Sequence, residues 1–255
     1  MAGNVTHLSI ALLLIVLVII GALIYARRKM KISFGLVGLG ALAFVLAVNI
    51  LERLVHSLVL QPNPDASISL IRKAPGVYVL YACLMAAIFE EGARYLVFYW
   101  LGKKRSLRLT DGLAYGLGHG GAELFLVGWV TFLLYLLVYL TGPSAKLPPI
   151  IAYQAWSLSP LSIYLGLLER LLAFALQICL SFWVYYALEK KKISYFFWAL
   201  VFHALCDLPA ALGQVGLLGN IWLLEGSLGL CLLVLIFLTR KYIIGPTLGG
   251  EKIGN

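Results

Sequence analysis

The stretch FEEGAR at residues 89–94 lies inside an apolar run, residues 76–101, that is long enough to cross a lipid bilayer. A charged side chain at the centre of a membrane helix costs at least about 2.5–3.5 kcal/mol. Glu90, Glu91 and Arg94 therefore need polar partners close by, and ionisable residues at this depth indicate a functional site. We expect other helices to bring polar side chains to the level of this stretch.

The composition is that of an integral membrane protein. Of the 255 residues, 62% are hydrophobic and 12% are charged, whereas about 25% of the residues of a soluble domain are charged. The net charge of +9 does not indicate nucleic-acid binding, because the basic residues form short clusters between apolar runs. All four cysteines lie inside apolar runs without paired spacing, so we interpret them as core residues rather than as metal ligands or disulfides.

About seven apolar runs reach the roughly 20 residues that a transmembrane helix needs. They lie near residues 8–26, 34–58, 76–101, 112–140, 162–188, 194–212 and 217–238. The first run is too long for the apolar core of a signal peptide, so we interpret it as a retained helix. The sequence therefore predicts one integral membrane domain, residues 1–255, with an all-α, multi-pass fold in the cell membrane.

Basic residues alternate between the connections of these runs. The connections after the first, third, fifth and seventh runs carry Arg27, Arg28, Lys29, Lys31, Lys103, Lys104, Arg105, Arg108, Lys190, Lys191, Lys192, Arg240 and Lys241. The other connections hold only Arg72, Lys73 and Lys146. Because basic loops stay on the cytoplasmic side, the alternation predicts an N-terminus outside the cell and a C-terminus in the cytoplasm.

Three of the predicted helices carry polar side chains three or four residues apart. The third has Glu90, Glu91 and Arg94, the fourth has His119 and Glu123, and the sixth has His203 and Asp207. Residues at i and i+4 share one face of a helix. At a rise of 1.5 Å per residue, these side chains lie about 12 to 21 Å from the cytoplasmic ends of their helices. Polar residues with unrelated structural roles would not be expected to lie at the same depth. The sequence therefore predicts that two histidines and four carboxylates meet in one polar site.

The fourth predicted helix also has a stripe of small residues. Gly112, Gly116, His119 and Glu123 fall at i, i+4, i+7 and i+11, and small residues let membrane helices approach closely. We expect this face to pack against a neighbouring helix rather than against lipid.

Other polar residues in the apolar runs have more than one interpretation. Gln177 lies about 17 Å from the cytoplasmic end of its helix and is a candidate for the same site. Glu169 and Arg170 lie nearer the outer side, as a structural ion pair or as partners for charges elsewhere. Glu52 is interpreted as an interfacial residue, and Glu225 has no assigned role.

Three motifs resemble those of a known family. Glu-Glu-x-x-Arg at residues 90–94, Gly-His-Gly-Gly-x-Glu at residues 118–123 and Phe-His-x-x-x-Asp at residues 202–207 resemble the YhfC family of bacterial intramembrane proteases, over most of the chain. That family is similar to the CAAX-prenyl-protease and bacteriocin-processing (CPBP) superfamily and to PrsW proteases. In the superfamily, three residues separate the paired glutamates from the arginine, and the second motif is Phe-x-x-x-His. Here two residues separate them, and Tyr115 stands at the position of the aromatic residue.

The resemblance implies an intramembrane endopeptidase that cleaves a membrane-embedded or membrane-anchored peptide or protein. In this interpretation Glu90 is the general base that activates a water molecule. Glu91 and Arg94 form a supporting pair, and His119 shares the water with Glu90.

The remaining polar residues would act on the substrate or hold a metal. His203 and Asp207 are expected to hold or polarise the scissile carbonyl. A zinc ion would suit His119, His203 and one or two of the carboxylates Glu90, Glu123 and Asp207. Because the spacing His-Glu-x-x-His is absent, the sequence does not require a metal and slightly favours a glutamate mechanism. The expected cofactor is therefore none or zinc.

A transporter is the alternative from a different functional class. Buried carboxylates and histidines also build proton relays and ion paths, so a proton- or metal-coupled carrier would use the same residues. An odd number of helices without matching halves is not typical of the inverted repeats of transporters. The expected partners are a peptide substrate and the lipid bilayer, and not nucleic acid.

Overall fold

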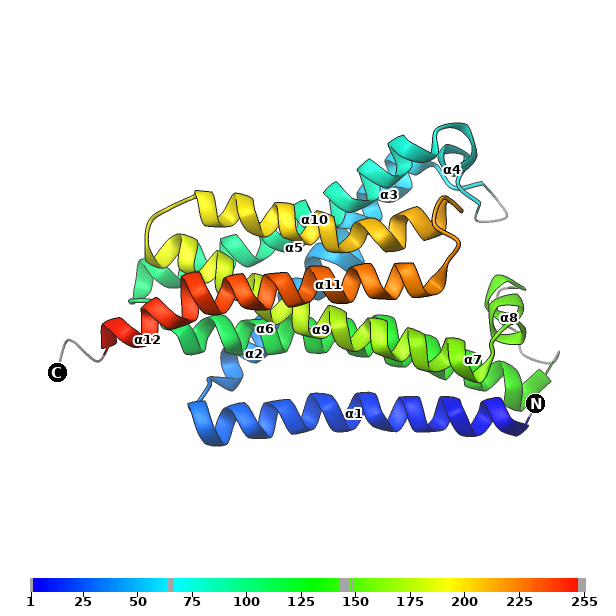
Figure 1. The fold of residues 1–255 in the computed structure, drawn as a ribbon, viewed down its shortest axis with the longest axis horizontal. Helices are drawn as coiled ribbons and strands as arrows, with labels where there is room; N and C mark the ends of the chain where they lie inside the picture. The colour runs from blue at the N-terminus through cyan, green and yellow to red at the C-terminus, as the bar shows by residue number, and fades with distance from the viewer. Residues whose placement is uncertain (1, 64–66, 143–146, 148, 252–255) are drawn as a thin grey trace.

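The described residues, 2–63, 67–142, 147 and 149–251, form helices and connections without a strand (Figure 1). The structure is a computed structural model. In this part of the chain seven helices are long and apolar enough to cross a membrane, which confirms the predicted multi-pass membrane protein. They span Gly3–Met30, Phe34–Leu60, Pro75–Lys104, Leu109–Thr141, Pro160–Glu189, Ser194–Gln214 and Ile221–Leu248.

Several spans consist of more than one helical segment. The α-helices are α1 (Ala2–Met30), α2 (Phe34–Phe44), α3 (Arg53–Leu60), α4 (Ser69–Lys73), α5 (Pro75–Lys104), α6 (Leu109–Glu123), α7 (Val130–Thr141), α8 (Pro149–Trp156), α9 (Pro160–Glu189), α10 (Ser194–Gln214), α11 (Ile221–Thr239) and α12 (Gly245–Glu251). Wider π-helical segments join α2 to α3 at Val45–Glu52, α6 to α7 at Leu124–Trp129, and α11 to α12 at Arg240–Ile244. Such segments are rare and frequently lie at functional sites.

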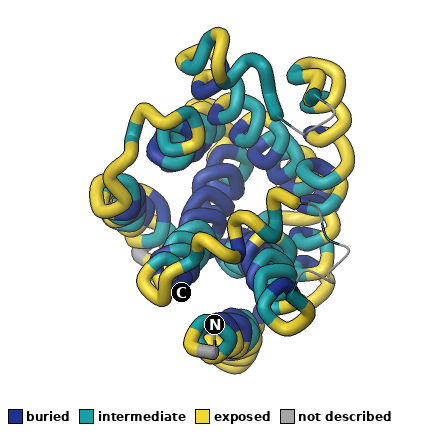
Figure 2. Tube along the Cα trace, turned by 90° about the vertical axis from the view of Figure 1, so that its right-hand side faces the viewer, coloured by how far each residue is buried: buried dark blue, intermediate teal, exposed yellow. Residues whose placement is uncertain are grey.

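Helix α9 lies at the centre of the bundle. In its most apolar stretch 67% of the residues are buried, whereas the corresponding share is at most 33% in the other spans. Phe98, Tyr115 and Trp183 belong to one core cluster around α9, and Leu8 and Ile15 of α1 belong to a second. Figure 2 shows the buried residues toward the middle of the bundle and the exposed ones around its outside. The polar side chains of α9 are therefore held inside the protein.

Glycines on two sides of α6 let it pack closely against two helices. A Cβ atom on Gly116 would lie 2.9 Å from the Cα atom of Ile178 in α9, and one on Gly118 would collide with the carbonyl oxygen of Val37 in α2. A side chain at either position would push the helices apart. The contact of Gly116 with α9 confirms that the face of α6 bearing the glycine stripe is turned toward protein.

The last span begins later than residue 217, where the sequence pattern placed its start. Gly216 has a left-handed backbone with φ 74°, which ends the preceding turn. The side chain of Asn220 then caps α11 by accepting hydrogen bonds from the backbone N–H groups of Trp222 and Leu223. The cap places the first residue of α11 at Ile221.

The direction of the chain in the membrane stays a prediction. The ends of α1, α5, α9 and α11, which the basic clusters follow, lie at the same end of the bundle as the C-terminus (Figure 1). Of the basic residues in the alternate connections, Lys146 lies outside the described residues.

Candidate active site

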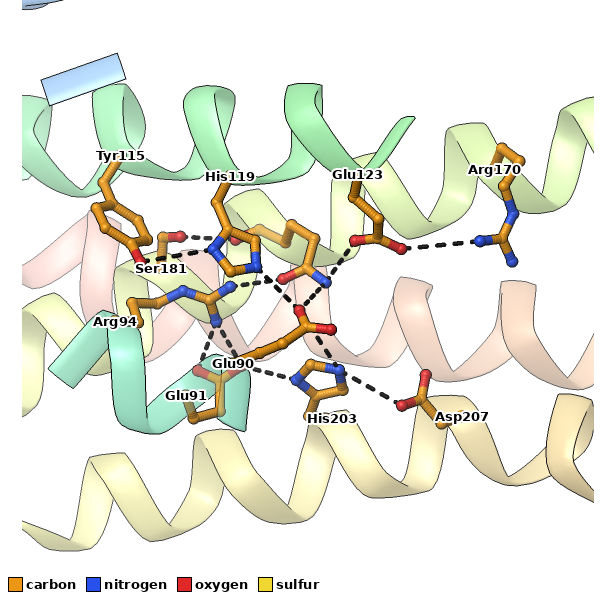
Figure 3. Close-up of polar contacts among 11 residues, drawn as sticks. Glu90, Glu91, Arg94, Tyr115, His119, Glu123, Arg170, Ser181, His203 and Asp207 are labelled. Carbon is orange, nitrogen blue, oxygen red and sulfur yellow. Dashed lines mark hydrogen bonds and ion pairs between the residues drawn. The ribbon is translucent and has the colours of Figure 1, made fainter. Parts of the chain in front are cut away.

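The seven predicted side chains lie in one network between the helices (Figure 3). Helix α5 supplies Glu90, Glu91 and Arg94, α6 supplies His119 and Glu123, and α10 supplies His203 and Asp207. The predicted meeting of polar groups from three spans is therefore observed. The chemical role of each residue stays a prediction.

Glu90 lies at the centre of this network. Its Oε2 atom lies 2.9 Å from His119 Nε2 and accepts a 2.7 Å hydrogen bond from Gln177 Nε2. His203 Nε2 lies 4.0 Å from the same oxygen. The other oxygen, Oε1, takes part in none of these three contacts, and the side chain lines a cavity. Glu90 thus has one anchored oxygen and a second that can face a water molecule.

Glu91 and Arg94 form a fully buried ion pair. Arg94 donates from Nη1 to Glu91, three residues earlier on α5. Both side chains are 0% exposed. The two intervening residues, one fewer than in the superfamily motif, place the guanidinium and the carboxylate on one face of the helix. The pair stabilises the position of α5. Removing one partner would leave the other charge buried without compensation.

His203 points into the protein rather than toward lipid. The residue is 2% exposed. Its Nδ1 atom lies 2.7 Å from Glu91 Oε1, and its Nε2 atom lies 3.4 Å from Asp207 Oδ2. Since one ring nitrogen faces Glu91, the other is directed at the space between Glu90 and Asp207. His203 therefore connects the buried ion pair to the cavity.

His119 is held in a closed pocket. Its side chain is 0% exposed, and its ring packs edge-on against Phe44 with centroids 5.1 Å apart. Tyr115 OH lies 3.5 Å from Nδ1. The aromatic residue noted at this offset in the sequence thus lies beside the histidine, and Nε2 is left to face Glu90.

Gln177 belongs to the network, although the sequence offered it only as a candidate. Its Oε1 atom accepts a 2.5 Å hydrogen bond from Arg94 Nη2. This bond fixes the amide so that Nε2 donates both to Glu90 Oε2 and to Glu123 Oε2, each at 2.7 Å. One amide from α9 therefore sets the spacing between carboxylates of α5 and α6.

The ion pair of Glu169 and Arg170 extends the network toward Glu123. Arg170 donates to Glu169, and its Nη1 atom lies 3.8 Å from Glu123 Oε1. Both interpretations left open by the sequence are therefore realised. Glu123 lies between the positive charge of Arg170 and the amide of Gln177.

The interfacial interpretation of Glu52 is wrong. Glu52 is only 6% exposed and ends the π-helical segment Val45–Glu52, whose wider turns shift the helix out of the 3.6-residue period used for the sequence interpretation. Its Oε1 atom lies 3.2 Å from His56 Nε2, and His56 Nδ1 lies 2.9 Å from Tyr81 OH.

Glu225 is also buried, and one of its carboxylate oxygens has no hydrogen-bond partner in the described part of the chain.

A cavity of about 170 Å³ lies between these side chains. Its walls include Glu90, Glu123, Glu169, Arg170, Gln177, His203 and Asp207. This volume has room for roughly five water molecules at about 30 Å³ each. The side chain of Asp207 is 35% exposed and that of Arg170 is 22% exposed, whereas that of Arg94 is fully buried. The cavity is therefore most exposed on the side of Asp207, and it does not extend to Arg94, which is not one of its wall residues.

The donor atoms suit a zinc ion, although they are not yet arranged as a ligand set. Among the described residues, no three His, Cys, Asp or Glu side chains already form a group that could hold a metal. Two imidazole Nε2 atoms nevertheless flank one carboxylate oxygen of Glu90, at 2.9 Å for His119 and 4.0 Å for His203. The Nδ1 atom of His203 faces Glu91, as the second ring nitrogen of a metal-binding histidine usually faces a carboxylate. Nitrogen and carboxylate ligands are those that zinc prefers, so the residues present fit the ion.

Comparison with known proteins gives a family for the matched region. The family described as YhfC intramembrane metalloprotease matches residues 13–228. A protein of Bacillus subtilis (strain 168), named uncharacterized membrane protein YhfC, is 34% identical over 213 residues, which cover 78% of this chain and 81% of the relative. No solved structure matches the chain. All seven predicted site residues lie inside the region that the family matches.

Proposed function

Because this chain belongs to the YhfC intramembrane metalloprotease family, we propose that it is an endopeptidase that hydrolyses a peptide bond inside the membrane with water activated at Glu90. The observation that carries this proposal is the position of Glu90. One carboxylate oxygen is anchored by His119 and Gln177, and the side chain borders a cavity large enough for water. The substrate is a membrane-embedded or membrane-anchored peptide, because the site lies within the spans.

In the proposed reaction the water oxygen attacks the carbonyl carbon of the scissile bond. Glu90 takes a proton from the water as a general base. A tetrahedral intermediate forms, and its carbon–nitrogen bond then breaks. The proton on Glu90 passes to the departing nitrogen, so the products are a carboxylic acid and an amine, and Glu90 is again a carboxylate.

The residues around Glu90 position the base and receive the developing charge. Arg94 and Glu91 hold α5 in place, and Gln177 holds the Glu90 carboxylate. His203, when protonated, donates from both ring nitrogens, so its Nε2 atom can donate to the oxyanion while Nδ1 donates to Glu91. Asp207 lies beside His203 at the open side of the cavity and would contact the substrate first.

The family description includes a metal, and the site contains suitable donors. His119, His203 and Glu90 would hold the ion, with Asp207 as a further carboxylate beside His203. A bound zinc ion would lower the pKa of a coordinated water molecule and polarise the substrate carbonyl. In that case Gln177, itself held by Arg94, keeps its task of orienting the Glu90 carboxylate.

The proposed orientation places the open side of the cavity in the outer half of the membrane. With the N-terminus outside, α10 runs outward from Ser194, so Asp207 lies further out than His203. Peptide substrates would therefore enter from the outer half. No observation favours the transporter alternative.

The decisive experiment compares Glu90→Gln with Glu189→Gln, which removes a carboxylate at the far end of α9. Each protein is reconstituted in proteoliposomes with a library of membrane-spanning peptides, and products are identified by mass spectrometry. We expect cleavage by the wild type and by Glu189→Gln, and a loss of at least about 10²–10⁴-fold in Glu90→Gln, as for removal of a general base. Equal cleavage by Glu90→Gln would remove Glu90 from the mechanism. No cleavage of any peptide by the wild type would contradict the peptidase.

A further inference from the structure

A second cavity lies away from the candidate active site, where α5 and α9 end and α10 begins. Its volume is about 580 Å³, and its walls come from the ends of α5 and α9 and from the two connections that follow them. Pockets for small ligands have volumes of about 300–1,000 Å³. Because three spans terminate here, the cavity lies at the level of a membrane surface.

Two lysines bring positive charge to this cavity without acidic partners. Lys103 and Lys191 both line it, and no ion pair to an acidic side chain is formed by either in the part of the chain that the structure describes. The ammonium group of Lys103 lies 4.3 Å from the centre of the Tyr99 ring. This contact holds the charge of Lys103 beside an aromatic wall.

The other charged residues of the cavity are already compensated. The guanidinium of Arg105 donates two hydrogen bonds to Asp111, at 2.7 and 2.9 Å, and these bonds raise the pKa of Arg105 above its ordinary value. Glu189 is paired with Lys190, whose Nζ atom lies 3.1 Å away. The charge that remains is that of the two lysines, so the cavity attracts an anion.

The remaining walls of the cavity are apolar or aromatic. Leu107, Leu188 and Ile193 contribute hydrocarbon surface, and Tyr95 adds a second aromatic ring. Tyrosine favours the boundary between lipid and water. A free inorganic anion would leave this hydrocarbon surface unused, whereas a lipid would cover it with an acyl chain.

We propose that this cavity binds an anionic phospholipid, with the headgroup phosphate at Lys103 and Lys191 and the start of an acyl chain along the apolar wall. Basic pockets between spans on the cytoplasmic side of membrane proteins bind anionic headgroups in this way. The predicted orientation places the cavity on that side, where anionic lipids are attracted to basic residues. The inference does not depend on the proposed peptidase activity.

The test measures binding of phosphatidylglycerol and phosphatidylcholine to the delipidated full-length protein by native mass spectrometry. We expect one phosphatidylglycerol to bind more tightly than phosphatidylcholine. The double substitution Lys103→Gln and Lys191→Gln should weaken the binding of phosphatidylglycerol by about 30-fold, because each basic residue at a membrane surface contributes about a factor of five in affinity. The matched control, Arg240→Gln with Lys241→Gln, removes two charges near the end of α11 and should leave the affinity unchanged.

A third variant separates a pocket from a charged surface. A Cβ atom on Gly102, which lines the cavity, would make only ordinary contacts, the nearest at 3.7 Å from Leu107. Gly102→Leu therefore fills the apolar part of the cavity without removing a charge, and it should also weaken the binding of phosphatidylglycerol. Equal losses in the Lys103/Lys191 and Arg240/Lys241 variants, or wild-type binding by Gly102→Leu, would overturn the proposal. Displacement of the lipid by millimolar inorganic phosphate would identify a site for free anions instead.

Discussion

The side-chain amide of Gln177 donates a 2.7 Å hydrogen bond to Glu90, which lies 87 residues earlier in the chain and on another helix. The same nitrogen also donates to Glu123. The NH2 group of an amide has two donor hydrogens, so it can serve two carboxylates, and here the amide oxygen accepts from Arg94, which fixes the amide orientation. The position of the proposed base thus depends on a residue that takes no part in proton transfer.

Gln177→Leu should reduce peptide cleavage without abolishing it. The substitution removes a hydrogen bond to a charged group, which contributes about 1.5–3 kcal/mol and corresponds to a rate loss of roughly 10- to 150-fold. The loss should appear in kcat, measured on the peptide library in proteoliposomes. Gln154→Leu on α8, outside the network, serves as the control. A wild-type kcat for Gln177→Leu would show that Glu90 is positioned without the amide.

Arg94→Met should destabilise the protein severely. It leaves the Glu91 carboxylate buried without its partner, a change that costs about 3–5 kcal/mol. The double variant Glu91→Leu with Arg94→Met removes both charges, so it should be more stable than Arg94→Met alone. Denaturant unfolding in detergent, followed by tryptophan fluorescence, measures both. The interpretation fails if the double variant is the less stable of the two.

Gly118→Ala should weaken the contact between α6 and α2. A Cβ atom there meets the carbonyl group of Val37, which is backbone and cannot rotate away. Overpacking of this kind costs about 1–3 kcal/mol. Gly38→Ala on α2 is the matched control, because a Cβ atom at Gly38 has no other atom within 4 Å. The same unfolding assay should show a loss for Gly118→Ala only.

Metal content should depend on the two histidines. We expect purified protein to hold one zinc ion, measured by elemental mass spectrometry, and we expect His119→Gln and His203→Gln to lose it. Glu169→Gln, which changes a carboxylate of the same cavity, should retain the ion. Chelation should abolish cleavage and added zinc should restore it. Full activity of metal-free protein would instead establish the glutamate mechanism that the sequence slightly favoured.

The predicted orientation can be tested with two serines at opposite ends of the bundle. Ser157 follows α8, and Ser106 follows α5, and both are exposed. Ser157→Cys should react with a membrane-impermeant maleimide on intact cells, whereas Ser106→Cys should react only after permeabilisation. The unsubstituted protein reports the background from its own four cysteines. The reverse labelling pattern would invert the topology.

The sequence predicted the site as far as helical periodicity reaches. His203 and Asp207 lie four residues apart, and a face shared by such a pair follows from the geometry of any regular helix. Depth could be estimated in the same way, since the rise per residue is constant. These two regularities were sufficient to predict that separate spans bring histidines and carboxylates together.

Periodicity gave less information where a residue stands alone or where the helix is irregular. Gln177 has no ionisable neighbour at i±4 on its own helix, only Ala173 and Ser181, so the spacing of charged pairs did not distinguish it from a core residue. Glu52 ends a π-helical segment, and its inward direction follows from a local change in helix geometry. The distances that decide between zinc and a metal-free site depend on side-chain positions, which spacing along the chain does not fix.

That the active-site cavity ends before Arg94 has a consequence for the cell. A peptidase in the lipid phase must admit water, yet a continuous column of water from one face to the other would let protons flow and discharge the membrane potential. In the described part of the chain, Glu91, Arg94 and Tyr115 are all buried and none of them lines the cavity, so the cavity ends before it reaches them. The proposed hydrolysis would then take place within the bilayer without a water path through the permeability barrier.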